Sequence, residues 1–507
     1  MANSARVIGA ETEYGIVTPT QPALSPIVSS THAVVAYALA HNRSQVAPRW
    51  DFSEESPLKD SRGFDLRRYH TVPSIDPHAI GVANAMLGNG GRFYVDHAHP
   101  EYSAPEVTSA VDAARYDAAG DLFLLQAAAL LKDYEAEGKS VLQGHDPCGE
   151  VKFYKNNVDG KGASYGAHEN YSYHRSTPFD QLAAALIPFF VARQVFIGAG
   201  RMGKGPRGER PGFQISQRAD YIEQEISLET TMNRGIINTR DESHTTEDFA
   251  RLHVIIGDAN MSHTSMLLKY GMTSLVLNAI EQGVDFSDVR MNNPVAEVTA
   301  VSYDPSLQHR ISLADGSTKT ALEILDIYRQ RVQASNDDET LVLKVWDEVR
   351  QALEAGPLGA AHLLDWCAKY ALVQNYIARG VAEDDPKLAL IDLQYADIDP
   401  AKSLYHALVR KNRMRTLFST EQLQQAAAQP PQSTRAWMRG NAVAYLDVQA
   451  ASWERLTIGN TTVRIASLLH PNAQDCQAID FQAQPDAQAL LELRGVEAVE
   501  PSGERLH

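Results

Sequence analysis

A charged pattern with a period of two residues, set among apolar residues, is the feature that most constrains the fold. In RVIGAETEYG, residues 6–15, Glu11 and Glu13 lie two apart. Neighbouring residues of a β-strand point to opposite faces of the sheet, so the two carboxylates share one face of a predicted strand. On a buried face such a pair is strongly unfavourable unless it is paired with cations or bound to a metal. The alternative is an exposed edge strand with a charged face.

A second segment, RFYVD, repeats this pattern. Arg92, Tyr94 and Asp96 share one strand face, and the turn predicted after them adds Glu101 and Glu106. Magnesium prefers carboxylate oxygens together with substrate phosphates, and a guanidinium suits a phosphate in bidentate geometry. With Glu11, these residues predict a site for magnesium and phosphate. The alternative is a solvated strand face.

Two further strand-like runs carry histidine. His168 and Asn170 share a face in SYGAHENY, and Arg251 and His253 share a face in RLHVIIGD. A single histidine is usually an ordinary core or surface residue, but two such polar pairs favour a site built across several strands. The sequence holds neither an HExxH motif nor a cysteine-rich zinc pattern.

The coarse organisation is a large unit followed by a small one. Residues 43–80 have little periodicity and predict a long, partly mobile loop. The Gly-rich stretch 198–212 lacks the order of a phosphate-binding loop and is interpreted as a flexible basic loop. Residues 426–434 read as a linker, which predicts domains at 1–430 and 435–507. Helices are predicted at 31–41, 109–137, 179–196, 263–282, 319–335, 339–355 and 361–379.

Charge and cysteine content exclude several classes of protein. The net charge of -17 disfavours nucleic acids and anionic membranes as partners, since both attract clustered Lys and Arg. Three well-separated cysteines form neither a disulfide framework nor a CxxC site. We find no signal peptide and no apolar run of about 18 residues, so we expect a cytoplasmic protein.

Several long motifs together resemble a known family. They are ETEYG, NGGRFYVDHAHPEYSAPE, KNNVDGKGASYGAHENY, GIINTRDESH, RLHVIIGDAN and STRAWMRG. In this order, over almost the whole chain, they are similar to the family of Pup ligases and Pup deamidase/depupylases, which act on the small protein modifier Pup. The segment 43–80 and the phrase DHAHPEYSAPE resemble the deamidase/depupylase branch.

The resemblance implies a fold and a set of site residues. The fold is α+β: a glutamine synthetase-like domain with a curved antiparallel sheet backed by helices, plus a small C-terminal domain. The implied cofactors are ATP and Mg²⁺, and the implied catalytic carboxylate is Asp96. The implied magnesium shell is Glu11, Tyr94, Glu101, His168 and His253. The implied nucleotide contacts are Arg92, Asn170, Arg251 and Trp453. Ala104 departs from the ligase branch, in which a threonine at this place contacts ATP.

The implied reaction is ATP-dependent hydrolysis of the C-terminal glutamine amide of Pup, or of the isopeptide bond between Pup and a lysine. Asp96 either attacks the carbonyl or deprotonates a water. The alternatives are a Pup–protein ligase and a non-catalytic Pup- or ATP-binding regulator. The expected partners are Pup and pupylated proteins, and the expected state is a monomer. Two basic groups are candidates for binding Pup: Arg201, Lys204, Arg207 and Arg210 in the Gly-rich loop, and Arg410, Lys411, Arg413 and Arg415. We favour the second, because it follows a helix-like segment with the apolar Leu404 and Leu408.

Overall fold

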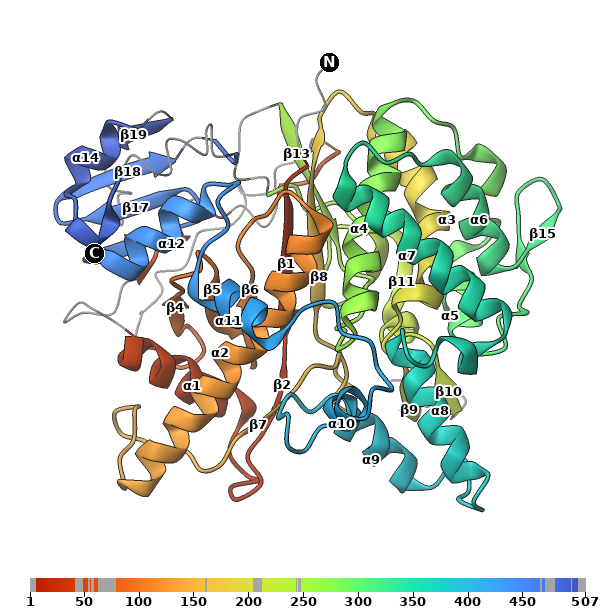
Figure 1. Cartoon of the computed structure of the whole chain (residues 1–507), viewed down its shortest axis with the longest axis horizontal. Coiled ribbons are helices and arrows are strands. Elements are labelled where there is room, and N and C mark those ends of the chain that lie inside the picture. The colour runs from red at the N-terminus through yellow and green to blue at the C-terminus, as the bar shows by residue number, and fades with distance from the viewer. Residues whose placement is uncertain are drawn as a thin grey trace.

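An eight-stranded sheet forms the centre of the protein. The computed structural model describes residues 6–41, 49–52, 55, 59–62, 79–159, 162–203, 212–242, 244, 248–465, 467–469, 479–493 and 495–499. The strand order is β11-β12-β13-β8-β1-β6-β5-β4, antiparallel except for the parallel pair β11–β12 (Figure 1). The strands are β1 (Ile8–Glu13), β4 (Asn84–Met86), β5 (Arg92–Asp96), β6 (His99–Ser103), β8 (Ala167–His174), β11 (Ile222–Ser227), β12 (Arg234–Asn238) and β13 (Phe249–Val254).

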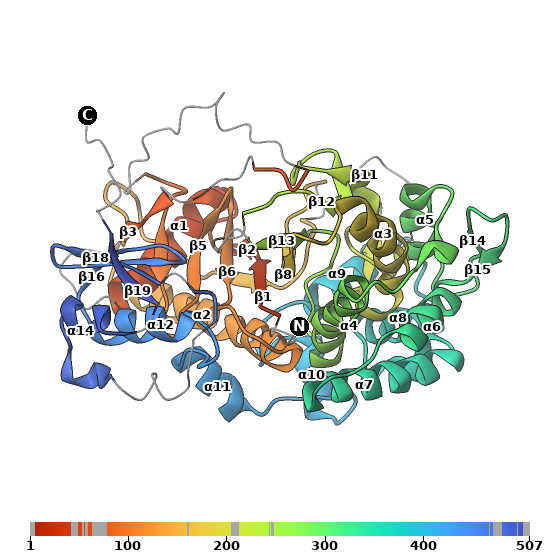
Figure 2. The ribbon, with the colours of Figure 1, turned by 90° about the horizontal axis from the view of Figure 1, so that it is seen from above.

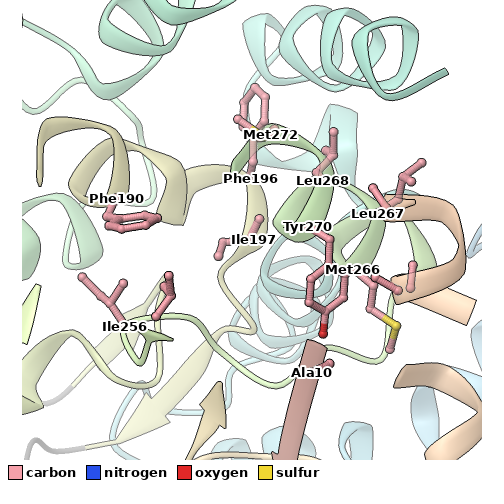
Figure 3. Close-up of a cluster of buried hydrophobic side chains, with 14 of the residues drawn as sticks. Ala10, Phe190, Phe196, Ile197, Ile256, Met266, Leu267, Leu268, Tyr270 and Met272 are labelled. Atoms are coloured by element: carbon pink, nitrogen blue, oxygen red, sulfur yellow. The ribbon is translucent and has the colours of Figure 1, made fainter. Parts of the chain in front are cut away.

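Long helices cover one face of this sheet. They are α1 (Pro26–His41), α2 (Ala110–Ala136), α3 (Phe179–Ile197) and α4 (His263–Glu281). The alanine-rich α2 begins after Ser109, whose side chain accepts a hydrogen bond from the Asp112 N–H, an arrangement that stabilises a helix start. Ala10 of β1 points into the same apolar layer as Phe196 and Leu268 of α3 and α4 (Figure 3). Because residues alternate along a strand, Glu11 faces the opposite side.

Helix α3 is the one helix, within the described part of the chain, that is long and apolar enough to cross a membrane. Its most apolar window is 83% buried inside the protein. Helix α6 (Ala321–Arg331) and the nearby α5 (Pro294–Ser302) contact it. This burial is that of a core helix.

The remaining elements of the large unit are five further helices and three short hairpins. The helices are α7 (Asp337–Glu354), α8 (Asp365–Ile377), α9 (Pro386–Tyr395), α10 (Leu404–Arg410) and α11 (Thr420–Ala428). Short hairpins are formed by β2 (Gly15–Val17) with β7 (Lys152–Tyr154), β9 (Arg201–Gly203) with β10 (Gly212–Gln214), and β14 (Ile311–Ser312) with β15 (Thr318–Lys319).

A second sheet of five strands lies at the other end of the molecule from α6 (Figure 2). Its order is β19-β18-β17-β16-β3, and it packs with α12 (Ala436–Tyr445) and α14 (Ala487–Leu491) around its own apolar cluster. The strands are β3 (Arg49–Trp50), β16 (Val448–Ala451), β17 (Arg455–Ile458), β18 (Thr461–Ile465) and β19 (Val496–Val499). Strand β3 joins it from the N-terminal half of the chain, pairing in parallel with β16.

The predicted α+β fold is confirmed, and most predicted helices occur within a few residues of their expected bounds. The segment 43–80 is anchored where the structure describes it. Arg49–Trp50 is a strand, and Asp60 accepts a hydrogen bond of 2.7 Å from Thr239 Oγ1. Its parts at 43–48, 53–54, 56–58 and 63–78 lie outside the described residues.

Three local predictions were wrong. Residues 99–103, expected as a turn, form the interior strand β6. The proline in HPEYS argued against a strand here, because proline is rare inside sheets. The expected linker at 426–434 begins inside α11, which runs to Ala428. Within the basic loop predicted at 198–212, Arg201–Gly203 form the strand β9 and Gly212 begins β10, while residues 204–211 lie outside the described part.

Candidate active site

The register of five neighbouring strands aligns the predicted polar residues on one face of the main sheet. Across β5, β6 and β1, Tyr94 lies opposite Glu101, and Glu101 lies opposite Glu13. One pair further along, Glu11 of β1 lies opposite His168 of β8. The strand-face groupings predicted from the sequence are therefore confirmed, and β6 inserts between the two carboxylate-bearing strands.

Four carboxylates and a histidine gather at the centre of this face. The ligand atoms of Glu11, Glu101 and His168 all lie within 4.8 Å of one another, and so do those of Glu13, Asp96 and Glu101. Glu101 belongs to both groups. Oxygen-rich sets of this kind are what hard divalent cations require, and an adjacent phosphate would supply the remaining oxygens.

The electrostatics of this cluster fit a divalent cation. Burial, together with the charges of Asp96, Glu13 and Glu11, raises the pKa of Glu101 well above its usual value. Burial also opposes ionisation of Glu11, but the hydrogen bond and charge of His168 outweigh it and lower the pKa of Glu11 to about 2. With all its carboxylates ionised, the cluster would hold more negative charge than its neighbours neutralise, and a bound cation would offset this charge.

A chain of hydrogen bonds orients Glu11. His168 Nδ1 lies 3.2 Å from Glu11 Oε2, and Asn170 Nδ2 donates to Glu11 Oε1 at 3.1 Å. His253 Nδ1 in turn lies 2.9 Å from Asn170 Oδ1. Burial lowers the pKa of His253 well below its usual value, so the ring is neutral and donates from Nδ1. Its Nε2 is buried and has no hydrogen-bond partner among the described residues, which leaves a lone pair for a ligand.

Tyr94 is a weaker candidate for the metal shell. Burial and the charges of Glu101 and Glu11 raise the pKa of Tyr94 well above its usual value, so the phenol stays protonated. It hydrogen-bonds Glu101, while Ser103 Oγ donates to the phenol oxygen at 3.4 Å. In this arrangement Tyr94 positions Glu101, and its place as a direct ligand stays a prediction.

Arg92 is held by residues that the sequence did not indicate. Its guanidinium stacks 4.0 Å from the ring centre of Trp50 and 3.9 Å from that of Tyr94. Its Nε donates to Asn84 Oδ1 at 2.6 Å, and it forms an ion pair of 3.6 Å with Glu55. Trp50 and Glu55 lie in the segment interpreted as a loop, so no pattern within the sequence connected them to Arg92.

A pocket opens beside the carboxylates. Three of the four predicted nucleotide contacts line it, and Arg92 is not among the lining residues; the polar and aromatic lining includes Glu11, Asn170, Arg251, Trp453 and Arg435. Arg251 forms an ion pair of 3.6 Å with Glu242, which also lines the pocket. A pocket with cations, an amide and an indole beside a carboxylate cluster suits a nucleotide whose phosphates point to the cluster.

A buried ion-pair network joins this pocket to the second sheet. Glu106, which follows β6, pairs with Arg435 at 3.0 Å and also with Arg439. Burial opposes its ionisation, but the charges of Arg439 and Arg435 outweigh it and lower the pKa of Glu106 to about 2. Arg439 Nη1 also donates to the Trp453 carbonyl at 2.6 Å. Both arginines lie in STRAWMRG, whose role was not predicted.

Asp96 lies at the open end of β5. Its side chain is 38% exposed, and His97 Nδ1 lies 3.0 Å from Asp96 Oδ2. Burial raises its pKa, but the hydrogen bond and charge of His97 outweigh this effect and lower the pKa of Asp96 below its usual value. Asp96 is therefore an ionised carboxylate that substrate and water can reach.

The raised pKa of Glu101 predicts how magnesium stabilises the protein at different pH. The folded state binds this proton more tightly than the unfolded chain, so without a cation its stabilisation is present at low pH and lost as the pH rises through the folded pKa. A bound cation displaces the proton. We expect the rise in Tm on adding MgCl₂ to be larger at pH 8 than at pH 6, by about 2 °C. Glu11, with a pKa of about 2, stays ionised throughout this range.

The control for this measurement is Glu101→Gln, which cannot titrate. Its magnesium-dependent rise in Tm should be small and the same at both pH values. Thermal melts of parent and variant, with and without MgCl₂, provide the comparison. A variant that keeps the parent's pH dependence would show that another group is its source.

Comparisons with known proteins agree with this geometry. A Pup deamidase/depupylase of Mycolicibacterium smegmatis is 47% identical over 478 residues, covering 91% of this chain and 94% of the relative. A Pup–protein ligase of Pseudarthrobacter chlorophenolicus is 40% identical over 372 residues, covering 71% of this chain and 80% of the relative. The resemblance to the deamidase/depupylase branch is thereby confirmed.

Two solved structures share the fold. The Pup ligase PafA in its complex with Pup aligns with a TM-score of 0.76 and 28% identity, covering 96% of this chain and 94% of that one. PafA in complex with ADP aligns with a TM-score of 0.71 and 31% identity, covering 84% of this chain and 97% of that one. The family model described as Pup-ligase protein matches residues 6–457. With its carboxylate cluster and adjoining pocket, the chain belongs to the Pup-ligase protein family.

Proposed function

We propose that this protein is an ATP- and Mg²⁺-dependent amide hydrolase that acts at the C-terminus of Pup. Its substrates are Pup ending in glutamine, which it deamidates, and Pup joined through a terminal glutamate to a lysine, which it releases. The observation that carries the proposal is the ionised, solvent-accessible Asp96 at the edge of the carboxylate cluster. The support from relatives is the 47% identity to a protein named Pup deamidase/depupylase.

Deamidation and release of Pup from a lysine are the same reaction with different leaving groups. Each breaks the bond between a side-chain γ-carbonyl and nitrogen, with ammonia or a lysine amine as the leaving group. Asp96 either attacks this carbonyl, giving a mixed anhydride that water then opens, or removes a proton from an attacking water. Both routes need an ionised carboxylate within reach of the substrate, which the lowered pKa and partial exposure of Asp96 supply.

The residues around Asp96 have distinct proposed roles. A bound Mg²⁺ ion would supply positive charge to the oxyanion and hold nucleotide phosphates; the residues proposed to hold it are Glu11, Glu101, His168, Tyr94 and His253. Glu13 also faces the cluster, with its Oε2 3.1 Å from His99 Nδ1. Arg92 is proposed to bind phosphate, which its guanidinium can do once it exchanges its ion pair with Glu55.

The nucleotide is proposed to occupy the pocket lined by Asn170, Arg251 and Trp453. ADP is bound in a solved structure of PafA that is 31% identical to this chain. We propose that ATP serves here as a cofactor and is not consumed in each cycle. Hydrolysis of an amide is favourable in water and needs no coupled nucleotide cleavage.

Ligation is the principal alternative, because a Pup–protein ligase is 40% identical over most of this chain. A ligase couples each new bond to the cleavage of one ATP. The higher identity and coverage of the deamidase/depupylase favour hydrolysis. A non-catalytic regulator is disfavoured because the chain retains the carboxylates of β1 and β5 in a shared cluster.

Pup is the proposed partner, and PafA is known in complex with Pup. The structure changes which residues of the basic cluster predicted to bind Pup are available for binding. Arg415 forms an ion pair of 2.7 Å with Glu348, and Leu404 and Leu408 pack against the main core. The cations near them with exposed side chains are Arg410, Lys411 and Arg413. A monomer in the cytoplasm stays part of the proposal.

The proposal predicts two products from two substrates. Pup ending in glutamine should gain about 1 Da by mass spectrometry, and a Pup–lysine conjugate should yield free Pup and the unmodified target. Both reactions should require ATP and MgCl₂ together, and omission of either should reduce the rate by at least about 100-fold. Absence of both products under these conditions, with nucleotide bound, would contradict the proposed function.

A further inference from the structure

The turn between β5 and β6 has an unusual residue beside Asp96. Asp96 pairs with His99 across the two strands, so His97 and Ala98 form a two-residue hairpin turn. His97 has φ of 53°, in the left-handed region. Glycine suits this backbone best; asparagine, aspartate and histidine adopt it more often than other residues do, at a cost relative to glycine of about 1 kcal/mol. A residue that fits this turn less well than glycine, next to a reactive carboxylate, suggests a role for its side chain.

The backbone of this turn is fixed independently of His97. Ser30 of α1 is buried, and its Oγ donates to the Ala98 carbonyl at 2.8 Å. Helix α1 also contacts β5 and β6. The turn conformation is therefore held from behind by the helix layer, and a glycine at position 97 would fit it better than histidine does.

Packing does not explain the histidine either. The side chain of His97 is 69% exposed, so it buries little surface. The ring contacts Asp96 through the 3.0 Å hydrogen bond between its Nδ1 and Asp96 Oδ2. Within the part of the chain that the structure describes, no other residue hydrogen-bonds this carboxylate. On the other strand, His99 engages Glu13 and not Asp96.

We propose that His97 is a positioning residue for the reaction, holding Asp96 Oδ2 through its Nδ1–H so that Oδ1 is presented to the substrate. The inference rests on the proposed role of Asp96. The last torsion of an aspartate side chain is broad, so an unrestrained carboxylate samples many orientations. A hydrogen bond to one oxygen narrows this range, and correct orientation of a reacting group contributes directly to rate.

The test compares two substitutions that both tolerate a positive φ. His97→Gly removes the donor and relieves the backbone. His97→Asn also accepts this backbone, and its Nδ2 stands at the same number of bonds from the main chain as His Nδ1. With Pup ending in glutamine as substrate, we expect kcat of His97→Gly to fall about 10-fold with KM unchanged and Tm not lowered. We expect His97→Asn to keep kcat within about 3-fold of the parent.

A purely structural histidine predicts a different pattern. In that case His97→Gly would match or exceed the parent in both kcat and Tm, and this result would overturn the inference. A glycine variant that loses kcat together with Tm, or an asparagine variant as slow as the glycine variant, would also overturn it. Asp96→Asn, measured alongside, separates the proposed function from the inference about His97. An active Asp96→Asn enzyme refutes the proposed role of Asp96. An inactive Asp96→Asn enzyme together with a fully active His97→Gly enzyme refutes only the role of His97.

Discussion

Replacing Asp96 with asparagine is expected to slow hydrolysis of both Pup substrates by about 10³-fold or more. Asparagine has nearly the shape of aspartate, and its amide oxygen can still accept the hydrogen bond that His97 gives to Oδ2. It lacks the ionised oxygen that attacks the carbonyl or accepts a proton. Because Asp96 does not line the proposed nucleotide pocket, nucleotide affinity should stay within about 3-fold of the parent.

The measurement is a single-turnover time course with Pup ending in glutamine, followed by mass spectrometry, together with a nucleotide titration. A matched control is Asp347→Asn on α7. Asp347 is an exposed carboxylate that pairs with Arg329 and is not part of the carboxylate cluster. The control should keep the parent rate. A rate for Asp96→Asn within about 10-fold of the parent would remove Asp96 from the chemistry.

The second large effect is expected from the carboxylates that are proposed to hold magnesium. Glu11→Ala and Glu101→Ala should each raise the magnesium concentration needed for nucleotide binding by about 10- to 100-fold. Glu101 should have the larger effect because it belongs to both acidic groups. Glu101→Ala should also raise the Tm of the cation-free protein. It removes a carboxyl group whose charged form is opposed by burial and by three neighbouring carboxylates.

Nucleotide titrations at several magnesium concentrations separate these effects. Glu150→Ala serves as the control, since Glu150 is an exposed residue that pairs weakly with Lys402 at 3.5 Å. It should change neither the magnesium requirement nor the Tm. An unchanged nucleotide affinity for Glu101→Ala at low magnesium would exclude Glu101 from the metal site.

Features that depend on local periodicity were predictable from the sequence. The two-residue period placed Glu11 with Glu13, and Tyr94 with Asp96, on common strand faces, because alternation is a property of any extended chain. The order and register of the strands are set by long-range pairing, so the sequence pattern did not show that Glu101 lies between Tyr94 and Glu13. The resemblance to a family placed Tyr94 and Glu101 together in one magnesium shell, but it did not include Glu13.

Contacts between distant segments were the features missed. The stacking of Trp50 on Arg92 joins two parts of the chain with no shared periodicity. The same is true of Glu106 with Arg435, which are 329 residues apart. Both contacts link the second sheet or its edge strand to the site, so they connect the C-terminal unit physically to the proposed nucleotide pocket.

Counting ADP against product tests the central claim most directly. Purified protein is incubated with Pup ending in glutamine, MgCl₂ and a limiting amount of ATP, and glutamate-ended Pup and ADP are quantified together. If ATP is a cofactor for hydrolysis, many molecules of product should form for each ADP released. One ADP for each product would contradict the cofactor role of ATP. The appearance of new Pup–lysine conjugates when glutamate-ended Pup and a target protein are supplied would identify a ligase.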